Sequence, residues 1–278
     1  MIAALFVLGL LIGSFLNVVV HRTPIILDRQ WRRQCDELAG REKPEAPRFN
    51  LVVPRSACPS CKAPIRAIHN VPVLSWLALR GQCASCKARI SARYPLVELL
   101  TGILSAAVAW KFGYSPQMGA ALVLTWFLIA LTFIDFDTQL LPDALTLPLL
   151  WLGLAASVLA YTPVEPRNAI VGALAGYLSL WSVYHLFRLA TGKEGMGYGD
   201  FKLLAALGAW LGWQMLLPII LLSAAVGAVT GIALILLRGR DRNIPIPFGP
   251  FLAAAGWVAL MWGPQIVTGY LGMFAAGR

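Results

Sequence analysis

Charged side chains are scarce in this chain of 278 residues. Asp, Glu, Lys and Arg make up 13% of it, against about 25% in a typical soluble domain. Hydrophobic residues reach 58%, above the roughly 45–50% of soluble proteins. So few charges cannot cover a water-exposed surface of this size. The composition therefore excludes an ordinary soluble globular protein and predicts a chain surrounded mainly by lipid.

Long apolar runs recur along the sequence and carry almost no charge. A helix that crosses the hydrocarbon core of a bilayer needs about 20 apolar residues, and helices satisfy their own backbone groups in lipid. The runs predict an all-α polytopic membrane protein with about eight transmembrane helices. The predicted spans are 2–20, 95–110, 116–134, 144–161, 169–187, 201–213, 215–237 and 248–270.

The basic residues are distributed unevenly between the loops. No charge precedes the first apolar run, so it is interpreted as an uncleaved anchor with its N-terminus outside. With eight alternating spans, twenty of the twenty-three Lys and Arg then fall in or beside the cytoplasmic segments. This bias is the positive-inside signature. We therefore attribute the net charge of +10 to topology and expect no nucleic-acid partner.

The only long hydrophilic stretch, residues 21–94, contains two cysteine pairs. Cys58 and Cys61 have the CxxC spacing, and so do Cys83 and Cys86. Two such turns can supply the four thiolates of a tetrahedral zinc site, which leaves no open position and is therefore structural. The alternative is a pair of redox motifs. The fifth cysteine, Cys35, is interpreted as a loop residue, and no firm structure is assigned to residues 28–47.

Acidic residues at the edges of the spans are the candidates for chemistry, because such positions are costly for a charge. Asp200 follows a glycine-rich approach that includes Gly197 and Gly199, so it is expected at a helix start beside a wet cleft. The simpler interpretation is that Asp200 caps the helix.

Three further acids cluster at the inner end of the third span. On a helix, Asp135 and Asp137 differ by about 200° and face opposite ways. Asp143 precedes an apolar run and is expected to cap the next helix, whereas Asp137 is expected to be solvated. Asp135 is left as the partner of Asp200. Two carboxylates that share one proton can activate water and polarise a peptide carbonyl, which is aspartyl protease chemistry.

Several blocks together resemble those of the type IV prepilin leader peptidases, which are GxGD aspartyl proteases. The blocks are residues 13–22 with Asn17 and Arg22, the paired CxxC turns, residues 93–101 with Glu98, Asp135 with residues 141–143, and residues 197–202. The resemblance runs from residue 13 to about residue 202. It implies that Asp135 and Asp200 are the catalytic pair and that Gly197 and Gly199 form their supporting loop.

The resemblance also implies a bifunctional enzyme of the bacterial inner membrane. Such an enzyme cuts basic leaders after a glycine from type IV prepilins or type II secretion pseudopilins at the cytoplasmic face. It then methylates the new N-terminus with S-adenosylmethionine. The expected domains are a first helix at 1–20, a cytoplasmic four-cysteine zinc domain at 21–94, and a seven-helix peptidase domain at 95–278. Candidates for the methyl-donor site are Asn17, Arg22, Glu98 and the zinc domain.

The main alternative is a proton-coupled transporter that uses the same acids as a proton relay. It predicts internal repeats and acids near the middle of the bilayer. The sequence shows no such repeat, and the acids lie at span edges. A zinc-stapled scaffold without chemistry, and a presenilin-like protease with a deeper site, are weaker alternatives.

Overall fold

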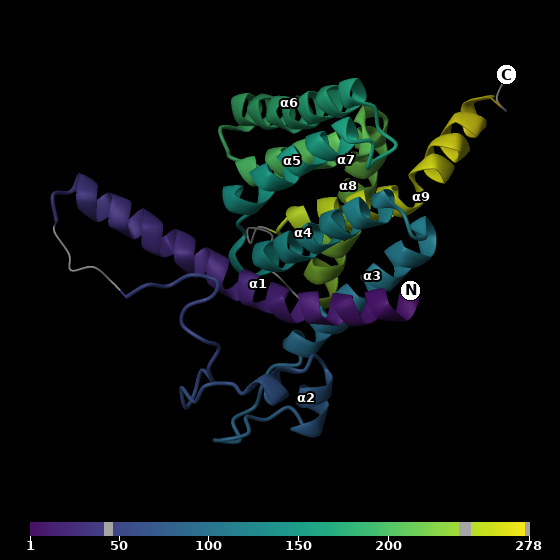
Figure 1. Cartoon of the computed structure of the whole chain (residues 1–278). Coiled ribbons are helices and arrows are strands. Elements are labelled where there is room, and N and C mark those ends of the chain that lie inside the picture. The colour runs from purple at the N-terminus through teal and green to yellow at the C-terminus, as the bar shows by residue number, and fades with distance from the viewer. Residues whose placement is uncertain (42–46, 239–245, 276–278) are drawn as a thin grey trace. The chain divides into compact units, whose positions relative to one another are not determined.

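The computed structural model describes residues 1–41, 47–238 and 246–275, with side chains through residue 268. Its regular elements are helices (Figure 1), and the described residues form isolated β-bridges but no strand. This confirms the predicted all-α fold. The elements are α1 (Ile2–Leu38), η1 (Ala67–Asn70), α2 (Leu74–Ala78), α3 (Arg93–Phe112), α4 (Pro116–Thr138), α5 (Asp143–Val158), α6 (Pro166–Thr191), α7 (Tyr198–Leu211), η2 (Trp213–Met215), α8 (Leu216–Arg238) and α9 (Gly249–Ala275).

Each predicted span falls on a helix, and the chain is a multi-pass membrane protein. Within the described residues, six stretches are long and apolar enough to cross a bilayer: Ile2–Leu38, Arg93–Phe112, Pro116–Thr138, Pro166–Thr191, Trp213–Leu237 and Gly249–Thr268. The predicted fourth and sixth spans correspond to α5 and α7, which have 16 and 14 residues. Both are shorter than the about 20 residues that a straight crossing requires.

Helix α1 extends far beyond the predicted first span. It continues through Leu38, whereas no firm structure was predicted for residues 28–38. Two ion pairs at i,i+4 spacing stabilise the extension: Asp28 with Arg32, and Arg33 with Glu37, each at 2.8 Å. The charges that suggested an irregular loop therefore pair along one helix.

The chain forms two compact units, Met1–Tyr114 and Ser115–Arg278. In the first unit α1 packs against α3 through small residues. A Cβ atom added to Gly13 would lie 2.7 Å from the Cα of Glu98, and one added to Gly9 would lie 2.7 Å from the carbonyl oxygen of Thr101. Only glycine permits so close an approach of two helix backbones.

In the second unit α7 is the central helix and packs against α5, α6 and α9. Ten of its fourteen residues are buried. The indole N–H of Trp210 donates to the carbonyl of Leu149 in α5 at 2.8 Å, and the backbones of Gly172 in α6 and Gly208 in α7 touch. Because protein rather than lipid surrounds α7, the bilayer thickness does not set its length.

Candidate active site and metal centre

Asp135 lies in the last turn of α4 and has only 5% of its surface exposed. Its Oδ2 accepts the backbone N–H of Gly249, the first residue of α9, at 3.0 Å. A Cβ atom on residue 249 would lie 2.6 Å from that oxygen, so the position requires glycine. Asp137 is exposed, as its opposite helical direction predicts. Asp135 is thus the acid of α4 that faces the interior of the unit.

Asp200 lies in the first turn of α7 and is 7% exposed. Gly197 holds the N-cap position, and Gly199 already belongs to the first turn of the helix. Asp200 is therefore near the helix start, as predicted, but it is not the cap. Its backbone N–H donates to the carbonyl of Gly197 at 3.2 Å. Among the described residues, no group donates to the buried Oδ1 atom of Asp200.

The segments that carry the two acids meet around Leu141. A Cβ atom on Gly199 would lie 2.6 Å from the Cβ of Leu141, and one on Gly249 would lie 3.1 Å from its Cδ1. The carboxylates of Asp135 and Asp200 are close enough to interact electrostatically. Two acids that are 65 positions apart in the sequence therefore share one buried region.

Asp143 does not cap α5, contrary to the sequence expectation. Pro142 holds the N-cap position, and Asp143 is the first helical residue with no capping hydrogen bond. Its Oδ1 instead lies 2.6 Å from the Nζ of Lys202 in α7, in a partly exposed ion pair. A carboxylate in the first turn also interacts favourably with the helix dipole. This ion pair joins the helix starts beside the acid site.

The four cysteines of the first unit converge. The Sγ atoms of Cys58, Cys61, Cys83 and Cys86 all lie within 4.8 Å of one another. A tetrahedral ion with metal–sulfur bonds of about 2.3 Å places neighbouring sulfurs roughly 3.8 Å apart. The Sγ atoms of Cys58 and Cys86 are 3.8 Å apart. The cluster therefore fits a metal ion, and Cys35 lies outside it, exposed on α1.

The two cysteine turns have the same backbone hydrogen bonds. The N–H of Cys58 donates to Ala63 and its carbonyl accepts from Lys62; Cys83 does the same with Ala88 and Lys87. Both turns direct backbone N–H groups at the first sulfur. For Cys58, the N–H groups of Cys61 and Ser60 lower the pKa of the thiol to about 6. This favours the thiolate form that a metal binds.

The other polar candidates bind backbone groups within the first unit. The Asn17 amide donates to the Tyr94 carbonyl at 3.1 Å, and Glu98 accepts the N–H of Val73 at 2.7 Å. Arg22 donates to the carbonyls of Asn50 and Pro54 at 2.8 and 2.6 Å. These contacts stabilise the fold and leave any role in methyl transfer untested.

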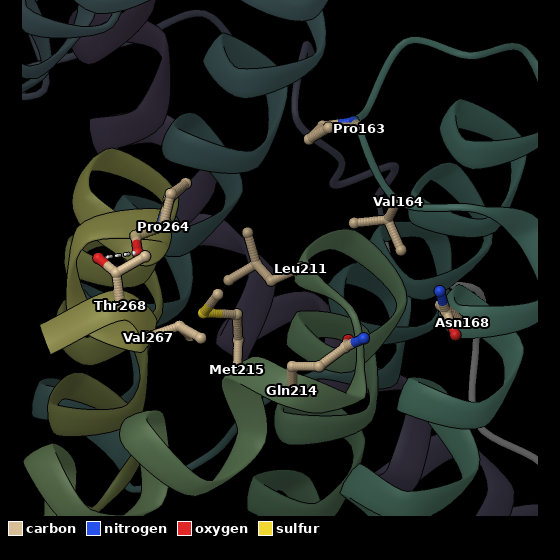
Figure 2. Close-up of a pocket in the computed structure, with 9 residues that line it drawn as sticks. All are labelled: Pro163, Val164, Asn168, Leu211, Gln214, Met215, Pro264, Val267 and Thr268. Carbon is tan, nitrogen blue, oxygen red and sulfur yellow. Dashed lines mark hydrogen bonds between the residues drawn. The ribbon is translucent and has the colours of Figure 1, made fainter. Parts of the chain in front are cut away.

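A pocket of about 360 Å³, whose lining residues are drawn in Figure 2, lies in the second unit. Leu211, the last residue of α7, and Met215 of η2 line it, together with residues at the start of α6 and near the Pro264 kink of α9. Leu211 lies eleven positions after Asp200 on the same helix, at the opposite end of α7 and about 16 Å along the axis. The pocket is therefore not part of the acid site.

Comparison with known proteins shows the family of the chain. Residues 7–112 match the bacterial peptidase A24 N-terminal domain, and residues 122–232 match the type IV leader peptidase family. The chain belongs to the type IV leader peptidase family. It is therefore an enzyme of the peptidase class. The first match contains all four clustered cysteines, and the second contains Asp135 and Asp200.

Similar curated proteins are named prepilin leader peptidase/N-methyltransferase. The protein of Aeromonas salmonicida (strain A449) is 58% identical over 96% of this chain and 92% of its own length. That of Pseudomonas aeruginosa is 56% identical over 95% and 91%, and that of Xanthomonas campestris pv. campestris is 53% identical over 95% and 92%. No solved structure matches the chain.

Residues 141–143 were part of the resemblance, but the sequence did not single out Gly249, which also shapes the acid site. Gly249 provides the hydrogen bond to Asp135, and Leu141 packs between the segments of both acids. Gly249 stands between Phe248 and Pro250 at the start of the last span, a position where a glycine interrupts an apolar run. That interruption was the available signal, but nothing in the sequence connects residue 249 with residue 135.

Proposed function

We propose that this chain is a prepilin leader peptidase and N-methyltransferase of the bacterial inner membrane, with Asp135 and Asp200 as its catalytic pair. Its substrates are type IV prepilins or type II secretion pseudopilins, cut after the glycine that ends a basic leader. The names of its relatives support the two activities. The observation that carries the peptidase assignment is that the segments of two buried acids converge. One acid accepts a backbone N–H, and the other buries an oxygen, Oδ1, to which no described group donates.

The unequal surroundings of the two acids suggest where their shared proton lies. Asp135 accepts a backbone N–H, which stabilises its ionised form. Asp200 has a buried oxygen without a described donor, a situation that favours the protonated acid. In the resting enzyme Asp135 is therefore the general base and Asp200 the general acid.

Cleavage then proceeds without a covalent intermediate. Asp135 takes a proton from water as the water oxygen attacks the carbonyl carbon of the leader glycine, and Asp200 gives its proton to the carbonyl oxygen. The resulting gem-diol collapses as the peptide C–N bond breaks. The leaving nitrogen takes the proton held by Asp135, and a gem-diol hydroxyl returns a proton to Asp200. Both acids are thereby restored.

The crowding around the acids is consistent with a small residue before the cut. Gly199 lies so close to Leu141, and Gly249 so close to the Asp135 carboxylate, that a methyl group on either glycine would clash. A substrate backbone must reach the carboxylates within these walls, and glycine needs the least room. The apolar segment that follows the leader would lie among the spans, with its boundary level with the acids.

The orientation follows from the loops. The acids lie at the end of α4 and the start of α7, the same side as the basic segment between α1 and α3 in the alternating topology. Positive loops remain in the cytoplasm. The active site and the cysteine cluster therefore face the cytoplasm, and the N-terminus lies outside. Acids at span ends, rather than at mid-span, do not favour the transporter alternative.

The metal that fits the cysteine cluster is zinc, held by Cys58, Cys61, Cys83 and Cys86. When bound, it cross-links the two cysteine turns and has no open position for catalysis. The methyl donor is S-adenosylmethionine, which would supply a methyl group to the new N-terminal nitrogen, with the proton of that nitrogen released to water. Asn17, Arg22, Glu98 and the zinc domain remain the candidates for this second site.

The test is leader cleavage by the purified full chain in detergent. A prepilin substrate is incubated with the wild type, Asp135→Asn and Asp200→Asn, and leader loss is read by mass. Asp137→Asn is the matched control, because residue 137 is exposed two positions from Asp135. We expect each variant of the pair to lose about 100- to 10,000-fold in rate, the usual contribution of positioned acid–base groups. The control should cleave normally.

Adding S-adenosylmethionine to the wild-type reaction should then increase the mass of the product by one methyl group. Full cleavage by Asp135→Asn or Asp200→Asn would disprove the catalytic pair. Cleavage without a later mass increase would disprove the methyl-transfer half alone.

A further inference from the structure

The segment between the first two membrane helices is strongly basic. Residues 47–94 contain no Asp or Glu. They contain eight basic residues: Arg48, Arg55, Lys62, Arg66, Arg80, Lys87, Arg89 and Arg93. All of these except Arg93 are exposed. Four thiolates around a divalent ion contribute a net charge of only about −2. A surface with this balance attracts anions and repels basic peptides.

Large apolar side chains are exposed on the same segment. Val52 is 78% exposed, Leu74 is 65% exposed and Leu77 is 58% exposed. They form two features, the 51–53 turn and one side of α2. Neither feature belongs to a predicted span. Clustered apolar side chains on a polar domain indicate a surface that meets a partner or a membrane.

The 51–53 turn is fixed at the membrane end of α1. Arg22 follows the predicted first span by two residues, and its guanidinium donates to the carbonyls of Asn50 and Pro54. The Asn50 side chain in turn accepts the N–H groups of Val52 and Val53, at 2.8 and 2.7 Å. The backbone of the turn is thus satisfied internally. Its apolar side chains remain outside, at the depth where the span leaves the hydrocarbon.

Helix α2 is fixed in the same way at the membrane end of α3. Glu98, the sixth residue of α3, accepts the N–H of Val73 directly before α2. Because the 20 residues of α3 only just span a bilayer core, a group bound to Glu98 lies near the membrane boundary. Val73 has φ 61° and ψ −51°, a strained γ-turn conformation for a β-branched residue. The carboxylate stabilises this conformation and so holds Leu74 and Leu77 near the boundary.

We propose that residues 47–94 lie on the membrane surface as a lipid-binding element. The 51–53 turn and the exposed leucines of α2 enter the interface, and the surrounding Arg and Lys side chains bind anionic lipid headgroups. This inference does not depend on the proposed catalytic pair.

Charge complementarity favours lipid over a protein partner for this surface. Each basic side chain near an anionic leaflet contributes about a fivefold preference for the surface. An apolar turn beside it adds burial in the interface. A basic leader peptide would be repelled instead. Lipid is also the one partner always present beside residues bound so close to the ends of α1 and α3.

The test places an environment-sensitive fluorophore on residue 52 of the full chain. Val52→Cys is made in a Cys35→Ser background, labelled with zinc bound to the other cysteines, and checked by mass for a single label. The matched control is the native chain labelled at Cys35, which is exposed on α1, 13 residues past Arg22, or about 20 Å along the axis. Both proteins are placed in nanodiscs of phosphatidylcholine with or without phosphatidylglycerol. Quencher-bearing lipids are included in parallel samples.

We expect the label at residue 52 to shift its emission to shorter wavelengths and to be quenched by the lipid-borne quencher, more so with phosphatidylglycerol. The label at Cys35 should do neither. Arg55→Gln should weaken docking about fivefold, whereas Lys111→Gln at the other end of α3 should not change it. A label at residue 52 that stays in water would overturn the proposal. A label that is shielded but not quenched by lipid would also overturn it, because the turn would then be covered by protein.

Discussion

The two units of this chain bury polar side chains in different ways. In Met1–Tyr114, the buried side chains of Arg22 and Glu98 each bind a backbone group. In Ser115–Arg278, Asp200 buries an oxygen that has no hydrogen-bond donor among the described residues. Buried polar groups normally have partners, and an exception needs a reason. The difference distinguishes polar side chains that stabilise the fold from the Asp200 carboxylate, to which we assign a role in catalysis.

Removing the metal should have the largest effect on the first unit. Structural zinc sites contribute on the order of 10 kcal/mol to the free energy of folding. Apart from the cysteine cluster, residues 47–94 contain little regular structure that could stabilise them. Cys58→Ser, or chelation, should therefore remove hydrogen-exchange protection from residues 47–94 while α4 to α7 stay protected. Cys35→Ser should change nothing. If residues 47–94 keep their hydrogen-exchange protection without metal, the cysteine cluster does not stabilise the segment.

Gly249→Ala should damage the acid site without removing an acid. The new Cβ would lie 2.6 Å from Asp135 Oδ2 and must displace that carboxylate. A misplacement of about 1 Å can cost roughly 100-fold in rate, so leader cleavage should fall by about that factor. Gly119→Ala is the matched control, because a methyl group there meets open space. Equal cleavage by both variants would refute the role assigned to Gly249.

Glu98→Ala should reduce the stability of the first unit. The variant leaves the N–H of Val73 without its acceptor, which costs about 1–3 kcal/mol when the group is buried. Glu98→Gln keeps an acceptor oxygen and should lose less. Thermal unfolding of the purified variants measures the difference. If Glu98→Ala unfolds at the wild-type temperature, the buried carboxylate is not holding the Val73 turn.

Lys202→Gln should have the smallest effect. Its partner Asp143 is 58% exposed, and exposed ion pairs contribute about 0–1 kcal/mol. Asp28→Asn, which breaks an ion pair on the α1 extension, should behave similarly in the same unfolding experiment. A loss of several kcal/mol from Lys202→Gln alone would place this pair among the groups that hold the second unit together.

Local patterns predicted what depends on local spacing. The two CxxC pairs could be predicted because each turn brings its own thiolates together. The helices could be predicted because crossing a lipid bilayer requires long apolar runs. The division of Asp135 from Asp137 followed from the helical period alone. To predict that Asp135 pairs with Asp200, one further inference was needed: that both residues lie at span ends on the same side of the membrane.

Contacts between residues that are far apart in the sequence could not be predicted from it. Asp143 was expected to cap α5, but its partner Lys202 is 59 positions away, and Gly249 is 114 positions from the acid to which it donates. The α1 extension was not predicted for another reason: paired charges rather than an apolar stripe stabilise it. The shortness of α7 also had no explanation in the sequence, because it goes with the packing of protein around this helix.

The most direct test of the central claim is a double-variant cycle on leader cleavage. Rates are measured for the wild type, Asp135→Asn, Asp200→Asn and the double variant, all shown to be folded. If the two acids act as one unit, the double variant should be no slower than either single variant, because each removes the same chemistry. Multiplied losses in the double variant, or substantial cleavage by either single variant, would contradict the shared role of Asp135 and Asp200.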